Sequence, residues 1–279
     1  MITRFAPSPT GLLHLGHAYA ARVAHELARI HDGSFLVRFE DIDHTRVRPD
    51  YYQAALDDLA WLGIRPTAEP WRQLDRLETY AAALEKLRTM GVLYPCFCTR
   101  REIETELAAM PAAPQGPEGP LYPGTCRHLS RAEIVDFTAL GREPAWRLHS
   151  AKAGALCGHL TFRDLRCGEM AVDPTLLGDA ILARRDIGTS YHLAVVVDDA
   201  AQEITHVTRG EDLLPATHLH RLLQNLLGLP KPLYLHHPLV TDEQGRRLAK
   251  RDHDRSLRSY RDSGLSPGEI LAILPPLPF

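Results

Sequence analysis

Residues 4–17 read RFAPSPTGLLHLGH, the stretch at which an apolar strand ends and a helix begins. Residues 7–11, PSPTG, cannot comfortably continue a strand, and apolar residues then recur at helical spacing until Gly33 supplies a stop. The first turn of a helix offers unpaired N–H groups and a partial positive charge, both of which favour phosphate. We therefore interpret this stretch as a nucleoside-triphosphate site.

Two histidines, His14 and His17, stand three residues apart at the start of this helix, so their rings share one face. Imidazole donors placed there can stabilise the negative charge that builds on an α-phosphate during in-line attack. Gly16 lacks the side chain that would keep a purine or phosphate at a distance. The competing interpretation is that these are two of the 15 histidines of the chain, on an exposed helix end.

The string Pro-x-Pro-Thr-Gly-x-x-His-x-Gly-His resembles the signature of class I aminoacyl-tRNA synthetases, and residues 4–11 resemble its glutamate-specific branch. The resemblance implies an α/β fold with a Rossmann-like parallel sheet. It also implies activation of L-glutamate by ATP, with Mg²⁺ on the phosphates. The site residues that it implies are Arg4, Phe5, Ala6, Pro7 and Ser8 for glutamate, and His14, Gly16 and His17 for ATP.

Size and composition describe an ordinary globular protein: 279 residues, 44% hydrophobic and 24% charged, enough for one large domain with or without an insert. The net charge of -3 gives no overall nucleic-acid footprint, so RNA contacts must come from local basic patches. The start of the chain lacks the pattern of a secretory signal, and no apolar run approaches the roughly 20 residues of a membrane span. We expect a cytoplasmic monomer that does not contact a membrane.

A further candidate residue, Glu40, follows the expected strand 34–39, SFLVRF, whose lack of polar interruption is typical of a buried parallel strand. Ligands of doubly wound sheets lie beyond the carboxyl ends of strands, where Glu40 could meet an amino acid's ammonium group. The alternative is a solvated acidic turn that begins the next helix. The family resemblance, through Arg-Phe-Glu-Asp, favours contact with the substrate. Residues 49–63 and 73–90 read as amphipathic helices of the core.

Three cysteines, Cys96, Cys98 and Cys126, nearly complete a tetrahedral zinc site. From chemistry alone the fourth ligand would be His128, because the phenol of Tyr122 must lose a proton with a pKa of about 10, although zinc can drive that loss. Short relatives of glutamyl-tRNA synthetase place Cys-x-Cys and Tyr-x-x-x-Cys around zinc, and this resemblance favours Tyr122. Three reduced cysteines without metal are the alternative.

These features divide the chain into three parts. We expect residues 1–95 to form the first half of the catalytic domain, residues 96–187 an inserted zinc-containing, acceptor-type subdomain, and residues 188–279 the second half. The insert contains a Pro-, Ala- and Gly-rich loop, and we expect strands within it near residues 146–148, 160–164 and 176–182.

The second half opens with residues 193–197, LAVVV, which we expect to be a buried parallel strand. Tyr191, just before it, can offer a hydroxyl and a ring wall to a small substrate. Arg209, in an expected strand 204–212, can grip a carboxylate with two prongs and would face the wrong group in an amide, which favours glutamate over glutamine. Taken alone, Tyr191 reads as a core aromatic and Arg209 as part of a surface ion pair.

Residues 188–199, GTSYHLAVVVDD, and 205–212, THVTRGED, again resemble the glutamyl-tRNA synthetase catalytic domain. The resemblance implies that Tyr191 and Arg209 belong to the amino-acid pocket. Val195 departs from the Asn that is usual in the full-length enzymes, which weakens a requirement for tRNA before activation. A helix at 218–227 and a strand at 233–237 should complete the sheet.

Residues 245–251, GRRLAKR, form a basic loop, and from residue 246 to 261 seven Lys or Arg against two Asp give a local charge of +5. Such a run alone is usually solvated surface. Here it resembles the second class I signature, Lys-Met-Ser-Lys-Ser, which implies that Lys250 stabilises the triphosphate in the transition state. Arg247 replaces the first lysine. Residues 266–269, SPGE, have the capping-box spacing that begins one last helix.

Full-length glutamyl-tRNA synthetases continue into a helical domain that reads the anticodon, and we expect no such anticodon-binding domain here. This combination resembles the stand-alone glutamyl-queuosine tRNA(Asp) synthetases, which implies the anticodon stem-loop of tRNA(Asp) as partner. Three alternatives are a truncated synthetase that charges the 3′ end of tRNA(Glu), a nucleotidyltransferase or amide ligase that uses no RNA, and a non-catalytic zinc-dependent RNA-binding module.

Overall fold

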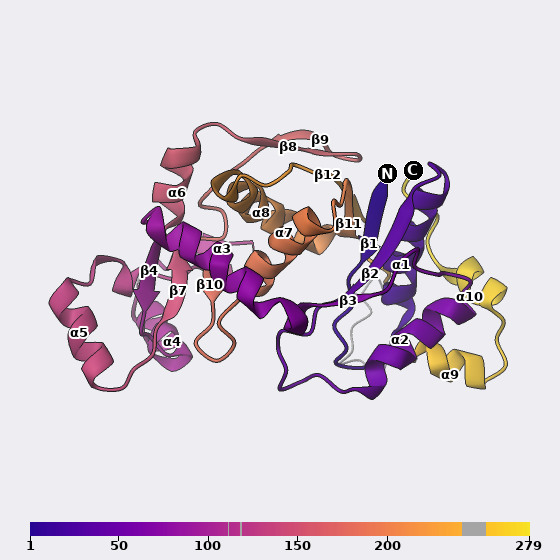
Figure 1. Cartoon of the computed structure of the whole chain (residues 1–279), viewed down its shortest axis with the longest axis horizontal. Helices are drawn as coiled ribbons and strands as arrows, with labels where there is room; N and C mark the ends of the chain where they lie inside the picture. Colours follow the sequence, from indigo (N-terminus) through magenta and orange to yellow (C-terminus); the bar gives the residue numbers. More distant parts are fainter. Residues whose placement is uncertain (111, 118, 242–254) are drawn as a thin grey trace.

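A central parallel sheet organises the computed structural model, which describes residues 1–110, 112–117, 119–241 and 255–279 (Figure 1). The strands hydrogen-bond in two groups, β1-β2-β3 and β11-β12-β8-β9, of which only β8 and β9 pair in antiparallel fashion. β1 lies beside β11, where Thr205 N donates to Ile2 O over 3.0 Å, so the central order 3-2-1-11-12 is doubly wound. The strands are β1 (Ile2–Phe5), β2 (Ser34–Phe39), β3 (Trp71–Arg72), β8 (Thr161–Asp164), β9 (Gly168–Ala171), β11 (His206–Gly210) and β12 (Leu233–His237).

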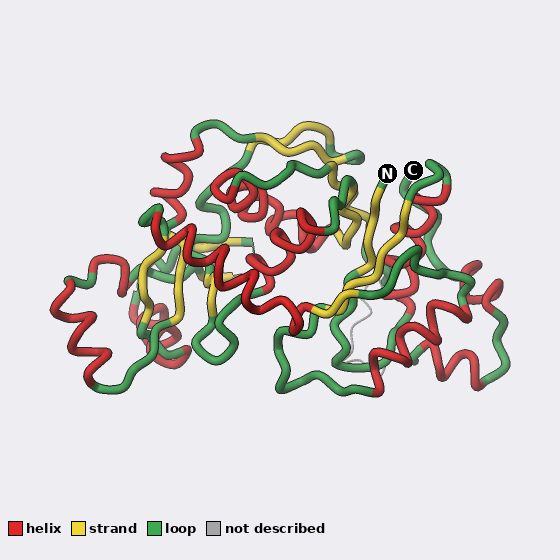
Figure 2. The backbone as a smooth tube through the Cα atoms, in the orientation of Figure 1, coloured by secondary structure: helices red, strands yellow, loops and turns green. Residues whose placement is uncertain are grey.

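Helices cover both faces of this sheet, as the tube of Figure 2 shows. Alternation along β2 sends Phe35 and Val37 into a core with α1, α2 and α10, whereas Arg38 points toward α7. A second core joins α3, α7 and α8. The helices are α1 (Leu15–Arg29), α2 (Asp50–Trp61), α3 (Leu77–Thr89), α7 (Tyr191–Ala201), α8 (Leu214–Leu227), α9 (Leu257–Asp262) and α10 (Pro267–Ile273), with 3₁₀ turns η1 (Gln73–Arg76) and η3 (Glu211–Leu213).

The expectation of a strand at residues 193–197 is wrong, because these residues form the middle of helix α7. The five apolar side chains are all buried against α3 and α8. A helix that is buried on every side shows the same short run of apolar residues as a buried strand, so the sequence pattern does not distinguish the two. The run continues into Asp198 and Asp199, which lie in the helix and not beyond the end of a strand. Strands 34–39 and 233–237 are confirmed at the expected bounds.

A smaller antiparallel sheet, β10-β7-β4, lies at the far side of α3 and α8 (Figure 1). Residues 161–164, expected in the insert, instead pair with β12 of the central sheet, because pairing partners of a short strand are set by tertiary contacts that the sequence does not encode locally. The boundaries at 95/96 and 187/188 stay predictions. Elements here are β4 (Leu93–Cys96), α4 (Arg100–Ala109), β5 (Gln115–Gly116), β6 (Gly119–Pro120), η2 (Thr125–His128), α5 (Arg131–Ala139), β7 (Ala145–Leu148), α6 (Ser150–Cys157) and β10 (Ile181–Ala183).

The C-terminal segment, from residue 255 onward, contacts the residues that immediately precede α1. Ser256 bridges to His14, and Leu257 N donates to Leu13 O over 2.8 Å. The capping box at Ser266 is confirmed at the start of α10. The basic loop, with Arg247 and Lys250, lies outside the described residues. Within the described residues, no helix combines the length and apolar character needed to cross a bilayer.

Candidate active site

A cavity of about 630 Å³ opens at the carboxyl ends of β1, β2 and β11, where a doubly wound sheet binds its ligands. Every described residue that the sequence assigned to glutamate or ATP lines it. These residues are Arg4, Phe5, Ala6, Pro7, Ser8, His14, Gly16, His17, Glu40, Tyr191 and Arg209. Lys250, expected at the triphosphate, is not among the described residues.

His14 and His17 cap the first turn of α1 with their side chains. The Nδ1 atom of His14 accepts a hydrogen bond from Gly16 N at 3.1 Å, and that of His17 accepts from His14 N at 3.3 Å. The ring centroids lie 3.9 Å apart. Because each Nδ1 accepts, a neutral ring carries its proton on Nε2. A Cβ atom on Gly16 would come within 3.0 Å of the His14 ring, so glycine permits this arrangement.

Arg4 and Arg38 share one buried carboxylate on the α7 side of the sheet. Arg4 Nε and Nη2 lie 2.9 and 3.2 Å from the two Asp199 oxygens, and Arg38 Nη2 lies 2.8 Å from Asp199. Asp198 binds Arg76 at 2.6 Å and accepts from Tyr80 at 2.6 Å. The positive charge of Arg4 therefore has a counter-ion within the protein, and its guanidinium is held rigidly at the wall of the cavity.

Glu40 reaches the cavity from the end of β2. Burial raises the pKa of its carboxyl to about 7, with Arg38 and Arg4 acting in the opposite direction. The nearest described ion-pair partner is Arg38, at 3.9 Å. Such a carboxylate, poorly neutralised in a buried site, suits an incoming ammonium group.

Arg209 is 6% exposed and makes hydrogen bonds only to uncharged groups among the described residues. Its Nε atom lies 3.2 Å from His236 Nε2, Nη1 lies 3.0 Å from His220 Nδ1 and 3.4 Å from the Tyr191 hydroxyl, and Nη2 lies 2.5 Å from Thr217 Oγ1. No carboxylate in the described part of the chain lies within ion-pair distance of this guanidinium.

The histidines around Arg209 are neutral. Burial, followed by the charge of Arg209, lowers the pKa of His236 to about 4, that of His192 to about 4, and that of His220 well below its usual value. A buried cation surrounded by neutral acceptors is costly unless an anion joins it. The arrangement therefore favours a ligand that brings a carboxylate to Arg209.

A second cavity, of about 360 Å³, adjoins the first and shares Ser8, Glu40 and Tyr191 with it. Its other walls come from β10 and the segment before α7, including Arg184 and Ser190. Ser190 is 7% exposed, and its hydroxyl has no hydrogen-bond partner among the described residues. This cavity lies between the central sheet and the smaller one.

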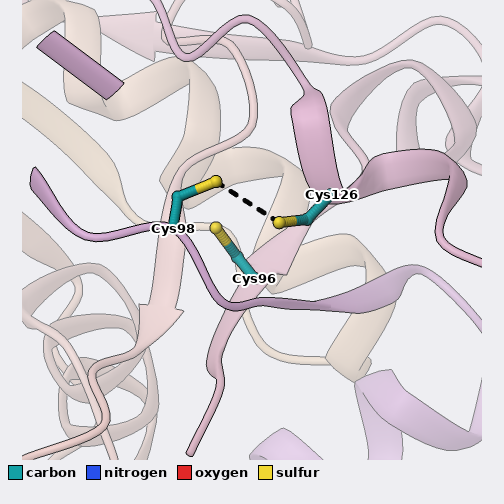
Figure 3. A group of neighbouring side chains, drawn as sticks. All are labelled: Cys96, Cys98 and Cys126. Atoms are coloured by element: carbon teal, nitrogen blue, oxygen red, sulfur yellow. Dashed lines mark hydrogen bonds between the residues drawn. The ribbon is translucent and has the colours of Figure 1, made fainter. Parts of the chain in front are cut away.

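Three cysteine sulfur atoms converge at the edge of the smaller sheet (Figure 3). The Sγ atoms of Cys96, Cys98 and Cys126 lie within 4.8 Å of one another, with 3.4 Å between Cys98 and Cys126. The Tyr122 hydroxyl lies 3.4 Å from Cys96 Sγ and 3.5 Å from Cys98 Sγ.

These distances fit the edges of a metal tetrahedron. With metal–sulfur bonds of about 2.3 Å and a metal–oxygen bond of about 2.0 Å, sulfur–sulfur edges are about 3.8 Å and sulfur–oxygen edges about 3.5 Å. Within the described residues, His128 is not part of this group of potential ligands, so Tyr122 is the better placed fourth ligand. Cys157 and Cys167 are free thiols that lie outside this group.

Comparison with known proteins shows the family of this chain. The family model described as "tRNA synthetases class I (E and Q), catalytic domain" matches residues 1–275. A glutamyl-Q tRNA(Asp) synthetase of Rhodobacter capsulatus is 50% identical over 98% of this chain and 99% of its own length. This chain belongs to the glutamyl-Q tRNA(Asp) synthetase family. A second member, from Nitratidesulfovibrio vulgaris, is 42% identical over 97% of this chain and 84% of its own length.

Glutamyl-Q tRNA(Asp) synthetases share their fold with glutamate–tRNA ligases. That of Aquifex aeolicus is 39% identical over 98% of this chain but only 56% of its own length. A glutamate tRNA ligase from Elizabethkingia meningosepticum, solved in complex with its amino acid, superposes with a TM-score of 0.81 at 26% identity, covering 98% of this chain and 60% of that one. The chain thus spans about three fifths of the length of these longer proteins.

Several site residues of this family member were not recognised from the sequence. Asp199 lies on α7, which the sequence pattern did not predict as a helix, and His220 lies on a helix whose pattern marks it only as core. His236 lies on a strand that the sequence predicted only as part of the sheet. The missing signal is tertiary, because these residues meet Arg4 or Arg209 from distant elements.

Proposed function

We propose that this chain uses ATP to activate L-glutamate as glutamyl-adenylate and transfers the glutamyl group to queuosine in the anticodon of tRNA(Asp). The single observation that carries the glutamate assignment is Arg209, a buried cation at the cavity wall with neutral hydrogen-bond partners in the described residues. The side-chain carboxylate of glutamate supplies the missing negative charge. Glutamine would leave that charge unmatched.

The remaining residues orient the amino acid around this ion pair. Glu40 receives the substrate ammonium, and the Tyr191 hydroxyl lies beside Arg209 at 3.4 Å. Ser8 supplies a hydroxyl from the turn after β1, while Phe5, Ala6 and Pro7 bring backbone and apolar contacts. Arg4 is held by Asp199, so it acts as a fixed positive wall and Arg209 as the principal carboxylate ligand.

ATP occupies the part of the cavity next to the first turn of α1. The glutamate α-carboxylate attacks the α-phosphorus in line, the bond to the β-phosphate breaks, and pyrophosphate leaves. The Nε2–H groups of His14 and His17 stabilise the oxygens of the reacting phosphate, and Lys250 completes this role from the basic loop. Mg²⁺ bound to ATP supplies charge neutralisation on the leaving pyrophosphate.

The acceptor nucleoside enters the second cavity. A hydroxyl of queuosine attacks the glutamyl carbonyl of the adenylate, and an ester bond forms. The bond between the carbonyl carbon and the phosphate oxygen breaks, AMP leaves with the bonding electron pair, and the proton of the hydroxyl passes to the leaving phosphate. The Arg184 side chain, which lines this cavity and pairs with Asp43 and Asp186, offers a cationic contact to a base extruded from an anticodon stem-loop. The enzyme acts as a monomer in the cytoplasm, where its RNA substrate is found.

The cysteine cluster would hold a structural zinc ion, with Tyr122 as its fourth ligand. Zinc held by four protein ligands would supply folding energy. The cluster joins the end of β4 to η2. Its residues are distant in sequence from the groups that we propose to react.

The experiment that tests the proposal is incubation of the protein with ATP, labelled glutamate and tRNA(Asp), with and without queuosine. We expect label on the RNA only with queuosine, and the label should survive removal of the 3′ terminus. Loss of label with the 3′ terminus would support a truncated glutamate–tRNA ligase. Complete turnover with a small-molecule acceptor and no RNA would overturn the proposal in favour of a small-molecule ligase.

A further inference from the structure

A buried chain of hydrogen bonds connects the wall of the glutamate cavity to strand β8. Arg209 Nε donates to His236 Nε2 at 3.2 Å, and His236 Nδ1 lies 2.7 Å from Asp164 Oδ2. Asp164 and His236 are each 1% exposed. The chain begins on β11, crosses β12 and ends on β8, so it follows the order of the sheet.

Each contact of the Asp164 carboxylate comes from a hydrogen-bond donor. Oδ2 accepts from His236 N at 3.0 Å as well as from the ring, and Oδ1 accepts from Arg166 N at 2.9 Å and Cys167 N at 2.8 Å. An ionised carboxylate is the side chain that satisfies four donors and offers none. The proton of the neutral His236 ring is therefore held on Nδ1.

This tautomer determines what Arg209 meets. With the proton on Nδ1, the Nε2 lone pair faces Arg209 Nε and the Thr217 hydroxyl, which lies 3.0 Å away. In the other tautomer an N–H group would face the guanidinium, donor against donor. The guanidinium would then have to rotate away from the plane in which its outer nitrogens reach the cavity.

We propose that Asp164 is a positioning residue for glutamate recognition: through the tautomer of His236 it fixes the plane in which Arg209 presents its two prongs to the substrate side-chain carboxylate. The inference rests on the proposed function, in which Arg209 holds that carboxylate. It assigns to β8, a strand that lines neither cavity, a part in discriminating glutamate from glutamine.

The test is Asp164→Asn in the full chain, measured by glutamate-dependent exchange of pyrophosphate into ATP. An amide in this place must direct its NH₂ group either at two backbone N–H groups or at His236, where it forces the proton to Nε2. We expect the KM for glutamate to rise about tenfold to a hundredfold, the preference over glutamine to fall, and the KM for ATP to stay within about twofold. An unchanged KM for glutamate and unchanged preference would overturn the inference.

The matched control is Asp58→Asn, since Asp58 is also a fully buried carboxylate but lies on α2, outside both cavities. All kinetic constants of this variant should remain at the wild-type value. An equal rise in the KM for glutamate in Asp58→Asn would mean that any buried carboxylate has this effect, and it would also overturn the inference.

A spectroscopic readout keeps the inference testable even if Asp164→Asn does not fold. The ¹⁵N spectrum of imidazole-labelled wild-type protein, assigned with His236→Asn, should show His236 protonated at Nδ1 and bare at Nε2. A proton on Nε2 would contradict it directly. The variant Arg209→Gln distinguishes failure of the proposed function from failure of this inference. If Arg209→Gln still activates glutamate, the proposed pocket is wrong. If Arg209→Gln is inactive and Asp164→Asn is normal, only the role of Asp164 is removed.

Discussion

At the scale of single residues, the proposed choice of glutamate as substrate depends on Arg209. Arg209→Gln removes the planar cation and leaves an amide facing a carboxylate, so we expect kcat/KM for glutamate to fall about a hundredfold or more in pyrophosphate exchange. Arg163→Gln, which changes an exposed arginine on β8, should leave the rate unchanged. Glutamate activation retained in Arg209→Gln would remove Arg209 from the pocket.

The carboxyl of Glu40 predicts a pH dependence of substrate affinity. Burial raises its pKa to about 7, so the carboxylate that meets the ammonium is lost as pH falls through 7. The KM for glutamate should therefore rise about tenfold per pH unit below 7 and level off above it. Glu40→Gln should have a high KM with no such slope between pH 6 and 8. A wild-type KM that is flat over this range would contradict the assignment.

Site residues could be predicted from the sequence where they lie close together in one motif. The turn after β1 brings Arg4, His14 and His17 into one cavity because they are neighbours in the chain. The histidine partners of Arg209 were not accessible, since His220 and His236 reach it from α8 and β12 only after the sheet has formed. Local patterns encode groups that line the cavity, while tertiary packing determines the groups that hold them.

At the scale of elements, helix α7 shows how a short apolar run can be mistaken for a strand. The helix is anchored by the polar contacts of its last turn. Its last turn carries Asp198, which accepts hydrogen bonds from Tyr80 and Gln73 and pairs with Arg76. Asp198→Asn leaves buried donors and a cation without their carboxylate, so unfolding free energy should fall by about 3 to 5 kcal/mol in urea denaturation. Asp75→Asn, on the exposed side of η1, should change it by less than about 0.5 kcal/mol.

The cysteine cluster where β4 contacts η2 predicts that the protein binds zinc. Substitution of Tyr122 or of His128 shows which of the two is the fourth ligand. We expect close to one zinc per chain by elemental analysis, and a lower melting temperature after chelation, because metal binding contributes folding energy. Tyr122→Phe keeps the ring stacked under Arg147 but removes the ligand oxygen, so zinc should dissociate at lower chelator concentration. His128→Ala should bind zinc like the wild type; the reverse pattern would make His128 the ligand.

At the scale of the whole molecule, the two faces of the central sheet make different kinds of contact. One face packs α1, α2 and α10 into an apolar core, whereas the other carries Arg38, Asp198 and Asp199 between the sheet and α7. The larger cavity, which we propose binds glutamate, opens where these two layers meet the ends of the strands. The doubly wound class followed from the sequence, but the pairing of β8 with β12 did not, and this pairing is what connects Asp164 to the cavity.

This architecture predicts that glutamate activation does not wait for RNA. The guanidinium of Arg209 is already fixed by His236, His220 and Thr217, and Arg4 by Asp199, so the pocket needs no partner to orient it. Pyrophosphate exchange should therefore proceed without tRNA, and added tRNA(Asp) should change its rate by less than about twofold, because a preorganised site leaves little ordering for a partner to supply. The control is tRNA(Asp) lacking queuosine, which should have equally little effect. A strict dependence of exchange on tRNA would show that the glutamate site is completed only in the complex.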